Sequence, residues 1–223
     1  MVTQTWRPWD ATAQRLIRVD ILRSRVHTHT PATGRRTVMA TEQHVGAAKP
    51  CVDGGLVINL RDGMGRYGRN GAFAWLLRDP VPGRRGNDAA VAPDGALWAG
   101  TMRYDEAPGG GNLGRLAPDG TARETLPGVT VSNGIGWSPD GSLMYYVDSP
   151  RAVSTTAPRR RTRHPPTTPG EAPHGLRLRR APELRDLYIT TARTGEARPH
   201  PPAGSLLVLR TAGQGLPGVA FGG

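Results

Sequence analysis

The sequence contains the stretch Val91-Ala-Pro-Asp-Gly-Ala-Leu-Trp-Ala-Gly-Thr-Met102 and a second one of the same design, Trp137-Ser-Pro-Asp-Gly-Ser-Leu-Met-Tyr-Tyr-Val-Asp148. Each consists of an apolar segment, a Pro-Asp-Gly turn and another apolar segment. The Asp-Gly pair supplies the positive φ that a tight hairpin turn requires, and the flanking apolar residues alternate with period two. Each copy therefore predicts a β-hairpin.

The hairpin recurs in weaker form elsewhere in the chain, at 9–20 and at 52–60. More polar hairpins, with turns at Gly34, Gly71 and Gly120, lie between the copies. Two hairpins make a four-stranded unit, and the turn aspartates Asp53, Asp94 and Asp140 follow one another after 41 and 46 residues. This spacing is typical of propeller blades, which repeat every ~40 to 50 residues. We expect one all-β propeller domain spanning residues 1–223.

The repeat is interrupted after Pro150. The segment 151–184 is rich in arginine and proline and contains neither aspartate nor asparagine, no Pro-Asp-Gly turn and no alternating apolar run. Strand-like patterns resume at 186–191 and 204–209. The sequence thus predicts a propeller that is incomplete around residues 151–184.

Composition and charge exclude several classes of protein. Glycine and proline number 30 and 21 of the 223 residues, which favours short elements joined by turns over a helical bundle. The net charge of +11 would ordinarily suggest an acidic partner such as nucleic acid. More than half of this excess, however, comes from 151–184, a segment that contains eight arginines, two glutamates and no aromatic residues. We therefore expect no specific nucleic-acid binding.

The chain also lacks membrane and disulfide signals. No apolar run approaches the ~18 to 20 residues of a membrane span, and the first residues lack the apolar core of a secretory signal. The single cysteine, Cys51, excludes an internal disulfide framework and fits a reducing compartment. We expect a soluble, cytoplasmic protein; the sequence does not indicate its oligomeric state.

Two asparagines occupy the same phase of the repeat. Asn87 lies six residues before Pro93, and Asn133 lies six residues before Pro139. Equivalent positions in successive blades lie at one end of the ring near its axis, so both amides should approach one site, to which the corresponding Gly46 adds no side chain. An amide oxygen can bind a hard cation such as calcium or a hydroxylated substrate. Both residues are also common turn formers, and spacing alone does not decide between these interpretations.

Longer motifs around these asparagines resemble a known family. They are Arg85-Gly-Asn-Asp88, the hairpin ending at Gly100-Thr-Met102, and Val131-Ser-Asn-Gly-Ile-Gly-Trp-Ser-Pro-Asp-Gly141. In combination they are similar to the SMP-30/gluconolactonase/LRE family over about residues 10–150. The resemblance implies a six-bladed β-propeller that opens sugar lactones with a divalent metal ion, calcium or zinc, in its channel.

The resemblance also implies roles for individual residues. Asn133 matches the family's metal-binding asparagine, while Arg85 and Asn87 match its substrate-binding arginine and asparagine. Asp105, three residues after Met102, lies where the family has an acidic substrate contact. The expected ligand is a small-molecule sugar lactone, whose carbonyl the ion would polarise.

Two of the family's three metal ligands have no counterpart in the sequence. The family's first glutamate would lie near 3–8, where no carboxylate occurs, and its aspartate would lie in a later blade, where 151–184 contains none. One neutral amide cannot hold a divalent ion firmly. The sequence therefore predicts a sugar lactone hydrolase with an impaired metal site; the alternative is a non-catalytic propeller that serves as a ligand-binding or interaction platform.

Overall fold

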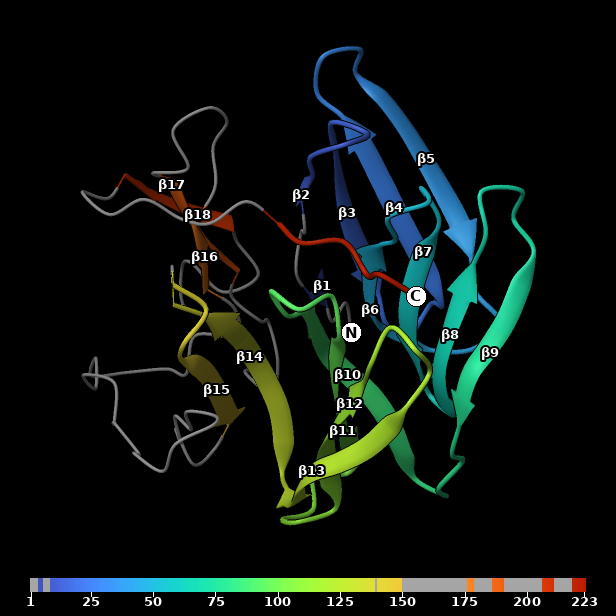
Figure 1. The fold of residues 1–223 in the computed structure, drawn as a ribbon, viewed down its shortest axis with the longest axis vertical. Coiled ribbons are helices and arrows are strands. Elements are labelled where there is room, and N and C mark those ends of the chain that lie inside the picture. The colour runs from blue at the N-terminus through green and yellow to red at the C-terminus, as the bar shows by residue number, and fades with distance from the viewer. Residues whose placement is uncertain are drawn as a thin grey trace, which may run out of the picture.

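The structure, a computed structural model, describes residues 4–5, 9–138, 140–149, 176–178, 186–190, 206–210 and 218–223. All regular elements in these ranges are β-strands (Figure 1). The first two sheets, of five and four strands, consist of β1 (Gln4–Thr5), β2 (Trp9–Asp10), β3 (Arg15–Asp20), β4 (Arg25–Thr30), β5 (Arg35–Ala40), β6 (Val45–Pro50), β7 (Leu56–Leu60), β8 (Gly63–Tyr67) and β9 (Phe73–Arg78). The later strands are β10 (Arg84–Val91), β11 (Leu97–Arg103), β12 (Gly111–Leu116), β13 (Ala122–Val129), β14 (Val131–Trp137), β15 (Met144–Ser149), β16 (Leu176–Leu178), β17 (Asp186–Thr190) and β18 (Leu206–Arg210).

The strands pair in chain order, as the repeat predicts. The first sheet runs β1-β3-β4-β5, with β2 also paired to β3, and the second runs β6-β7-β8-β9. The third contains β10 to β13, and a single pairing of Met102 with Val131 joins it to the next hairpin, β14-β15. All of these strand pairs are antiparallel, which confirms the expected all-β propeller architecture.

The predicted turns are where the sequence places them. In the β10–β11 turn, Gly95 adopts a φ of 80° and its amide donates to the Ala92 carbonyl at 2.9 Å, while the Ala92 amide donates to the Ala96 carbonyl at 2.8 Å. The Asp94 carboxylate accepts a further hydrogen bond from the Ala96 amide at 3.1 Å. Gly120 closes the β12–β13 turn in the same way, with a φ of 87°. A residue with a side chain would be strained at either glycine.

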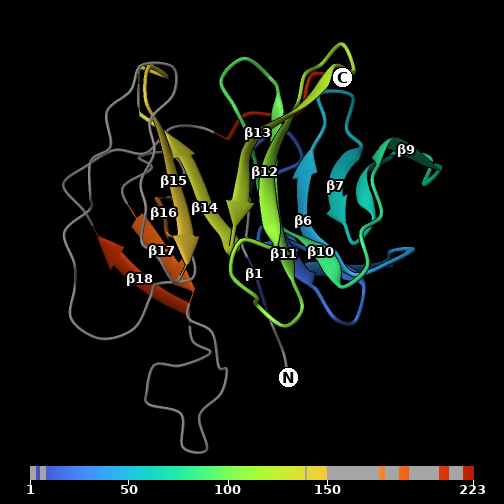
Figure 2. The same cartoon turned by 90° about the horizontal axis from the view of Figure 1, so that it is seen from below.

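The innermost strands β6, β10 and β14 follow one another around the axis, and β6 contacts β10 as β10 contacts β14. Apolar residues fill the spaces between neighbouring sheets in three clusters. The first contains Ile17 and Ile58, the second Val57 and Leu97, and the third Ile135 with the fully buried Tyr146. Figure 2 shows the sheets side by side, with β15 and β14 followed by β13 and β12 and then by β6 and β7. This packing fixes the ends of the inner strands relative to one another.

The last residues of the chain return to the second and third sheets. Phe221 is buried and belongs to the apolar cluster between them. Its amide donates to the Pro50 carbonyl at 2.9 Å and its carbonyl accepts from the Val52 amide at 2.9 Å, while the Gly222 amide donates to Gly95 at 3.3 Å. The C-terminal residues therefore connect the β6–β7 turn with the β10–β11 turn of the neighbouring blade.

The interrupted part of the repeat is described only in fragments. The strands predicted at 186–191 and 204–209 are confirmed by β17 and β18, which pair with each other. A short strand, β16, lies at Leu176–Leu178, where the sequence reading expected none; leucines on both sides of Arg177 give it a period-two pattern too short to stand out. The rest of 151–184 lies outside the described residues. So do residues 3 and 6–8, where the family's first metal-binding glutamate would be expected.

Candidate functional site

Each of the innermost strands β6, β10 and β14 contains a register shift near its beginning. The shifts lie between Val45 and Ala47, between Gly86 and Ala89, and between Asn133 and Ile135. A β-bulge inserts an extra residue and turns its side chain out of the regular alternation. The residues that the strand register skips are Gly46 in β6, Asn87 and Asp88 in β10, and Gly134 in β14, which directly follows Asn133. The three positions of equal phase in the sequence, Gly46, Asn87 and Asn133, therefore lie at or beside the bulges of successive blades.

Buried amides connect these blades. Asn59 on β7 donates from Nδ2 to the Asn87 carbonyl at 3.2 Å and to the Gly100 carbonyl at 2.8 Å. Asn87 in turn donates from Nδ2 to the Ser132 carbonyl of β14 at 2.8 Å. Each amide thus donates to backbone carbonyls at or close to the bulges, where the strand pairing is interrupted. This arrangement gives Asn87 a structural task in addition to the substrate-binding role expected of it.

Arg85 lies on β10 beside Asn87 and is 7% exposed. Its Nη1 donates to the Gly86 carbonyl at 3.0 Å and to Asn87 Oδ1 at 2.7 Å. None of the ion pairs between described residues includes Arg85, and its Nε and Nη2 have no acceptor among these residues. Burial lowers the pKa of Arg85, opposed by Tyr104 and Glu106. The guanidinium therefore remains cationic with one edge available to a ligand.

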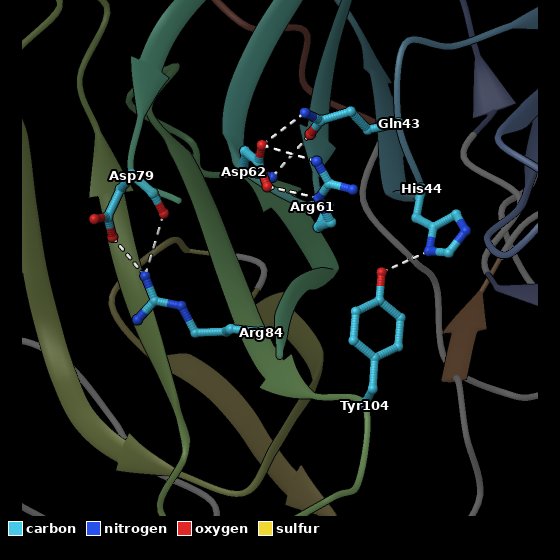
Figure 3. Close-up of polar contacts among 7 residues, drawn as sticks. All are labelled: Gln43, His44, Arg61, Asp62, Asp79, Arg84 and Tyr104. Atoms are coloured by element: carbon cyan, nitrogen blue, oxygen red, sulfur yellow. Dashed lines mark hydrogen bonds and ion pairs between the residues drawn. The ribbon is translucent and has the colours of Figure 1, made fainter. Parts of the chain in front are cut away.

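Tyr104, in the loop after β11, covers this arginine. Its ring centroid lies 5.8 Å from the Arg85 guanidinium carbon, which is a cation–π arrangement. The Tyr104 hydroxyl and His44 Nδ1, which precedes β6, form a hydrogen bond of 2.5 Å (Figure 3), and the two rings meet edge to face. Burial, followed by the charges of Arg61 and Arg85, lowers the pKa of His44. At neutral pH the imidazole is neutral, so it can accept the tyrosine proton in a hydrogen bond.

Other arginines near this place are held by carboxylates. Arg61 donates from Nε and Nη2 to Asp62 at 2.7 and 3.0 Å, and Gln43 also binds Asp62. Arg84 donates to Asp79 at 2.5 Å and is turned away from the His44–Tyr104 pair (Figure 3). We call His44, Arg61, Arg85 and Tyr104 the rim cluster. Within it, only Arg85 combines deep burial with the absence of a carboxylate partner.

Asp105 is placed beside the rim cluster but is occupied by a neighbour. Its carboxylate accepts two hydrogen bonds from Arg103, at 2.8 and 2.7 Å, and one from the Ala107 amide at 3.2 Å. The Arg103 hydrogen bonds, more than any other contact, lower the pKa of Asp105 to about 2. The carboxylate is therefore ionised, and a substrate hydroxyl could reach it only at the oxygen positions that Arg103 leaves open.

Asn133 carries the clearest sign of a missing partner. The residue is 5% exposed, its Nδ2 lies 3.4 Å from Ser149 Oγ, and its buried Oδ1 has no hydrogen-bond partner among the described residues. A buried, unsatisfied amide oxygen is a suitable ligand for a hard cation. In the described part of the chain, however, no three histidine, cysteine or carboxylate side chains gather at one point. The described residues therefore do not fit a firmly bound divalent ion.

The sequence reading missed three residues of this site: His44, Asn59 and Tyr104. A usable signal existed for His44, which lies two residues before Gly46 just as Arg85 lies two before Asn87. Asn59 interrupts the buried apolar strand β7, and a polar residue in such a strand indicates a buried hydrogen bond. Nothing in the local pattern marks Tyr104, whose importance depends on the fold of the β11–β12 loop.

Known proteins resemble this chain in sequence and in fold. The family model described as the SMP-30/gluconolactonase/LRE-like region matches residues 7–169. The chain belongs to the SMP-30/gluconolactonase family. Among curated relatives, the 6-deoxy-6-sulfogluconolactonase of Pseudomonas putida is 31% identical over 148 residues, which cover 65% of this chain and 51% of that protein. Regucalcin of Danio rerio is 33% identical over 152 residues, covering 63% and 49%. The matched region spans about half the length of these family members.

Solved structures of the SMP-30/gluconolactonase type show the same fold. A luciferin-regenerating enzyme superposes with a TM-score of 0.80 at 18% identity and covers 99% of this chain and 95% of its own. Regucalcin from Agrobacterium tumefaciens gives a TM-score of 0.79 at 21% identity, covering 99% and 93%. At these identities the likeness concerns the fold alone. Among the described residues, no helix is long and apolar enough to cross a membrane.

Proposed function

We propose that this chain binds a small sugar lactone at the ends of β10 and β14 and hydrolyses it poorly, because its metal site is impaired. The observation that carries the proposal is that Asn87, which binds Arg85 on β10, also donates to the Ser132 carbonyl on β14, directly before Asn133 in the next blade. The names of its relatives support the substrate class, since they include a sulfogluconolactonase and a pentonolactonase.

The proposed roles follow from the chemistry of each group. Arg85 presents its Nε and Nη2 edge to the oxygens of the sugar, while its other edge is fixed by Asn87. Asn87, with both ends of its amide engaged, acts mainly by positioning Arg85. Asp105 on the adjacent loop would accept a hydrogen bond from a hydroxyl of the ligand.

A divalent ion, calcium or zinc, would in an intact site polarise the lactone carbonyl and activate a water molecule. Asn133 Oδ1 is the group proposed to approach such an ion here, as a neutral oxygen at which no three histidine, cysteine or carboxylate side chains of the described chain gather. Hard cations require several oxygens and usually carboxylate charge. We therefore assign no catalytic step to a metal in this chain.

The second candidate function is that of a non-catalytic propeller that binds ligands without turnover. It is favoured by the same lack of a ligand cluster around Asn133. Hydrolysis of D-glucono-1,5-lactone, followed by acid release with and without calcium or zinc, separates the two. Turnover that rises with the ion and falls in Asn133→Ala supports a residual lactonase. Binding of the ligand with hydrolysis at the uncatalysed rate under every condition supports the platform.

A further inference from the structure

The rim cluster contains an uncompensated positive charge. Arg85 is buried, and no carboxylate among the described residues forms an ion pair with it. An isolated charge is costly to bury, so buried guanidinium groups are ordinarily paired. The Tyr104 ring compensates one face of the guanidinium, but its Nε and Nη2 edge is left without an acceptor. This edge has the geometry that binds the two oxygens of a carboxylate.

The surroundings of this edge are also positive. The charged groups that lower the pKa of His44, after burial itself, are Arg61 and Arg85, so both guanidinium groups act on the same imidazole. Arg61 uses Nε and Nη2 for Asp62, and Figure 3 shows its guanidinium on the side of Asp62 that faces His44. The negative groups nearby are Asp62, which Arg61 holds, Asp105, which Arg103 holds, and Glu106, an exposed residue that affects the pKa of Arg85 less than burial does.

We propose that Arg85 and Arg61, together with the hydroxyl of Tyr104, form a subsite for an anionic group, so that the preferred ligands are sugar acids and acid-bearing sugar lactones rather than neutral sugars. The inference rests on the proposed function for the sugar part of the ligand only. A carboxylate, sulfonate or phosphate would complete the open edge of Arg85, beside the Tyr104 hydroxyl. The shared requirement is a charged group with two or more acceptor oxygens.

The test measures binding of three matched probes to the full chain by isothermal titration calorimetry at low ionic strength. D-Gluconate and D-glucitol differ by a carboxylate in place of a hydroxymethyl group, and D-glucitol 6-phosphate carries a phosphate instead. We expect D-gluconate to bind roughly 10-fold more tightly than D-glucitol, and the difference to shrink with added salt. Tighter binding of the phosphate alone would identify phosphate as the anionic group. Equal binding of all three probes, or binding of none, overturns the proposal.

Variants locate the subsite. Arg85→Gln should remove most of the preference for D-gluconate, and Arg61→Gln should reduce it several-fold. Arg84→Gln is the matched control, because its side chain comes from the neighbouring position of β10 but pairs with Asp79. Thermal unfolding of each variant shows whether it is folded; if Arg85→Gln is not, the half-exposed Arg61 still decides. If Arg84→Gln and Arg61→Gln lose the same share of the preference for D-gluconate, the assignment of the subsite is contradicted.

Lactone turnover is measured separately, so the two proposals can fail independently. Preference for D-gluconate without any acceleration of lactone hydrolysis leaves the anionic subsite standing and removes the lactonase. Accelerated hydrolysis with equal binding of D-gluconate and D-glucitol supports the lactonase and removes the anionic subsite. If D-gluconate slows the catalysed hydrolysis of D-glucono-1,5-lactone and D-glucitol does not, anion binding and lactone hydrolysis take place at one site.

Discussion

The repeats β6–β9 and β10–β13 have the same strands and turns but contribute differently to the candidate site. The bulge of β6 lies at Gly46, two residues after His44, whereas the bulge of β10 begins at Asn87, two residues after Arg85. A Cβ on Gly46 would collide with the Asn87 carbonyl. The absence of a side chain at Gly46 of the first repeat therefore allows the backbone of the β10 bulge to lie directly against β6. Functional asymmetry here arises from close packing of two nearly equivalent blades.

The largest loss of stability is expected from a change at Phe221, whose side chain packs against both repeats. Phe221 packs in the apolar cluster between them, and its backbone bonds to Pro50 and Val52. Phe221→Ala should lower the free energy of unfolding by about 3–5 kcal/mol, because it leaves a cavity and loosens the C-terminal residues. Urea denaturation measures the change. Val219→Ala, at an exposed position of the same segment, is the control and should change it by less than about 0.5 kcal/mol. A small effect of Phe221→Ala would show that the blades hold together without the C-terminus.

Making the two repeats alike should be nearly as damaging. Gly46→Asn gives β6 the residue that β10 has, but its Cβ would overlap backbone atoms of Gly86 and Asn87 that cannot swing aside. We expect a loss of about 3 kcal/mol in the free energy of unfolding, the upper end for overpacking. Gly136→Asn adds the same side chain on β14 in open space and should cost far less. If the two variants are equally stable, the bulges do not pack as closely as described.

A smaller loss is expected from the amide that connects the repeats. Asn59→Leu keeps the size of the side chain but leaves the carbonyls of Asn87 and Gly100 without this donor. Buried unsatisfied carbonyls cost about 1–3 kcal/mol, and we expect about 2 kcal/mol by urea denaturation. Asn70→Ala, in the exposed β8–β9 turn, serves as the control. An unchanged Asn59→Leu protein would mean that the bulge carbonyls find other donors.

The sequence predicts the fold well because the information is local and repeated. A Pro-Asp-Gly turn between alternating apolar residues specifies a hairpin at each copy, and the spacing of Asp53, Asp94 and Asp140 specifies the blade. Equal phase also predicts that Asn87 and Asn133 occupy matching positions. Phase does not reveal which atoms are already satisfied. Only the structure shows that Asn87 is bonded at both ends while Asn133 Oδ1 lacks a described partner.

The residues that the sequence did not predict depend on contacts between blades. The bond from Tyr104 to His44 joins residues 60 positions apart, and no local pattern encodes it. The pairing of Asp105 with Arg103 is local, but whether it forms depends on the conformation of the β11–β12 loop. Strand β16 was missed because three residues give too short a period to distinguish from chance.

The smallest expected effect concerns an ion pair that both repeats contain. Asp94 of the β10–β11 turn binds Arg115 of β12 at 2.8 Å, and Asp53 of the β6–β7 turn binds Arg66 of β8. Burial acts to raise the pKa of Asp94, but the hydrogen bonds from Arg115 and the Ala96 amide outweigh it, so the net shift is downward. A carboxylate whose pKa is lowered by folding stabilises the protein above its unfolded pKa, near 3.8, and loses this contribution as the pH falls through the lower folded value.

Asp94→Asn should therefore lower the free energy of unfolding at pH 7 by at most about 1 kcal/mol, because the pair is largely exposed to solvent. The difference from the unsubstituted chain should shrink as the pH is lowered below 3.8, where the carboxylate becomes protonated in the unfolded chain and then in the folded one. Urea denaturation at pH 7 and at acidic pH measures it, with Arg115→Gln and the double variant completing the cycle. The Asp53–Arg66 pair should give a coupling of similar size, because its side chains are 44% and 30% exposed, against 57% and 20% for Asp94 and Arg115. A larger coupling there would mean that the two turns are not equivalent, and that the repeat symmetry ends at the strands.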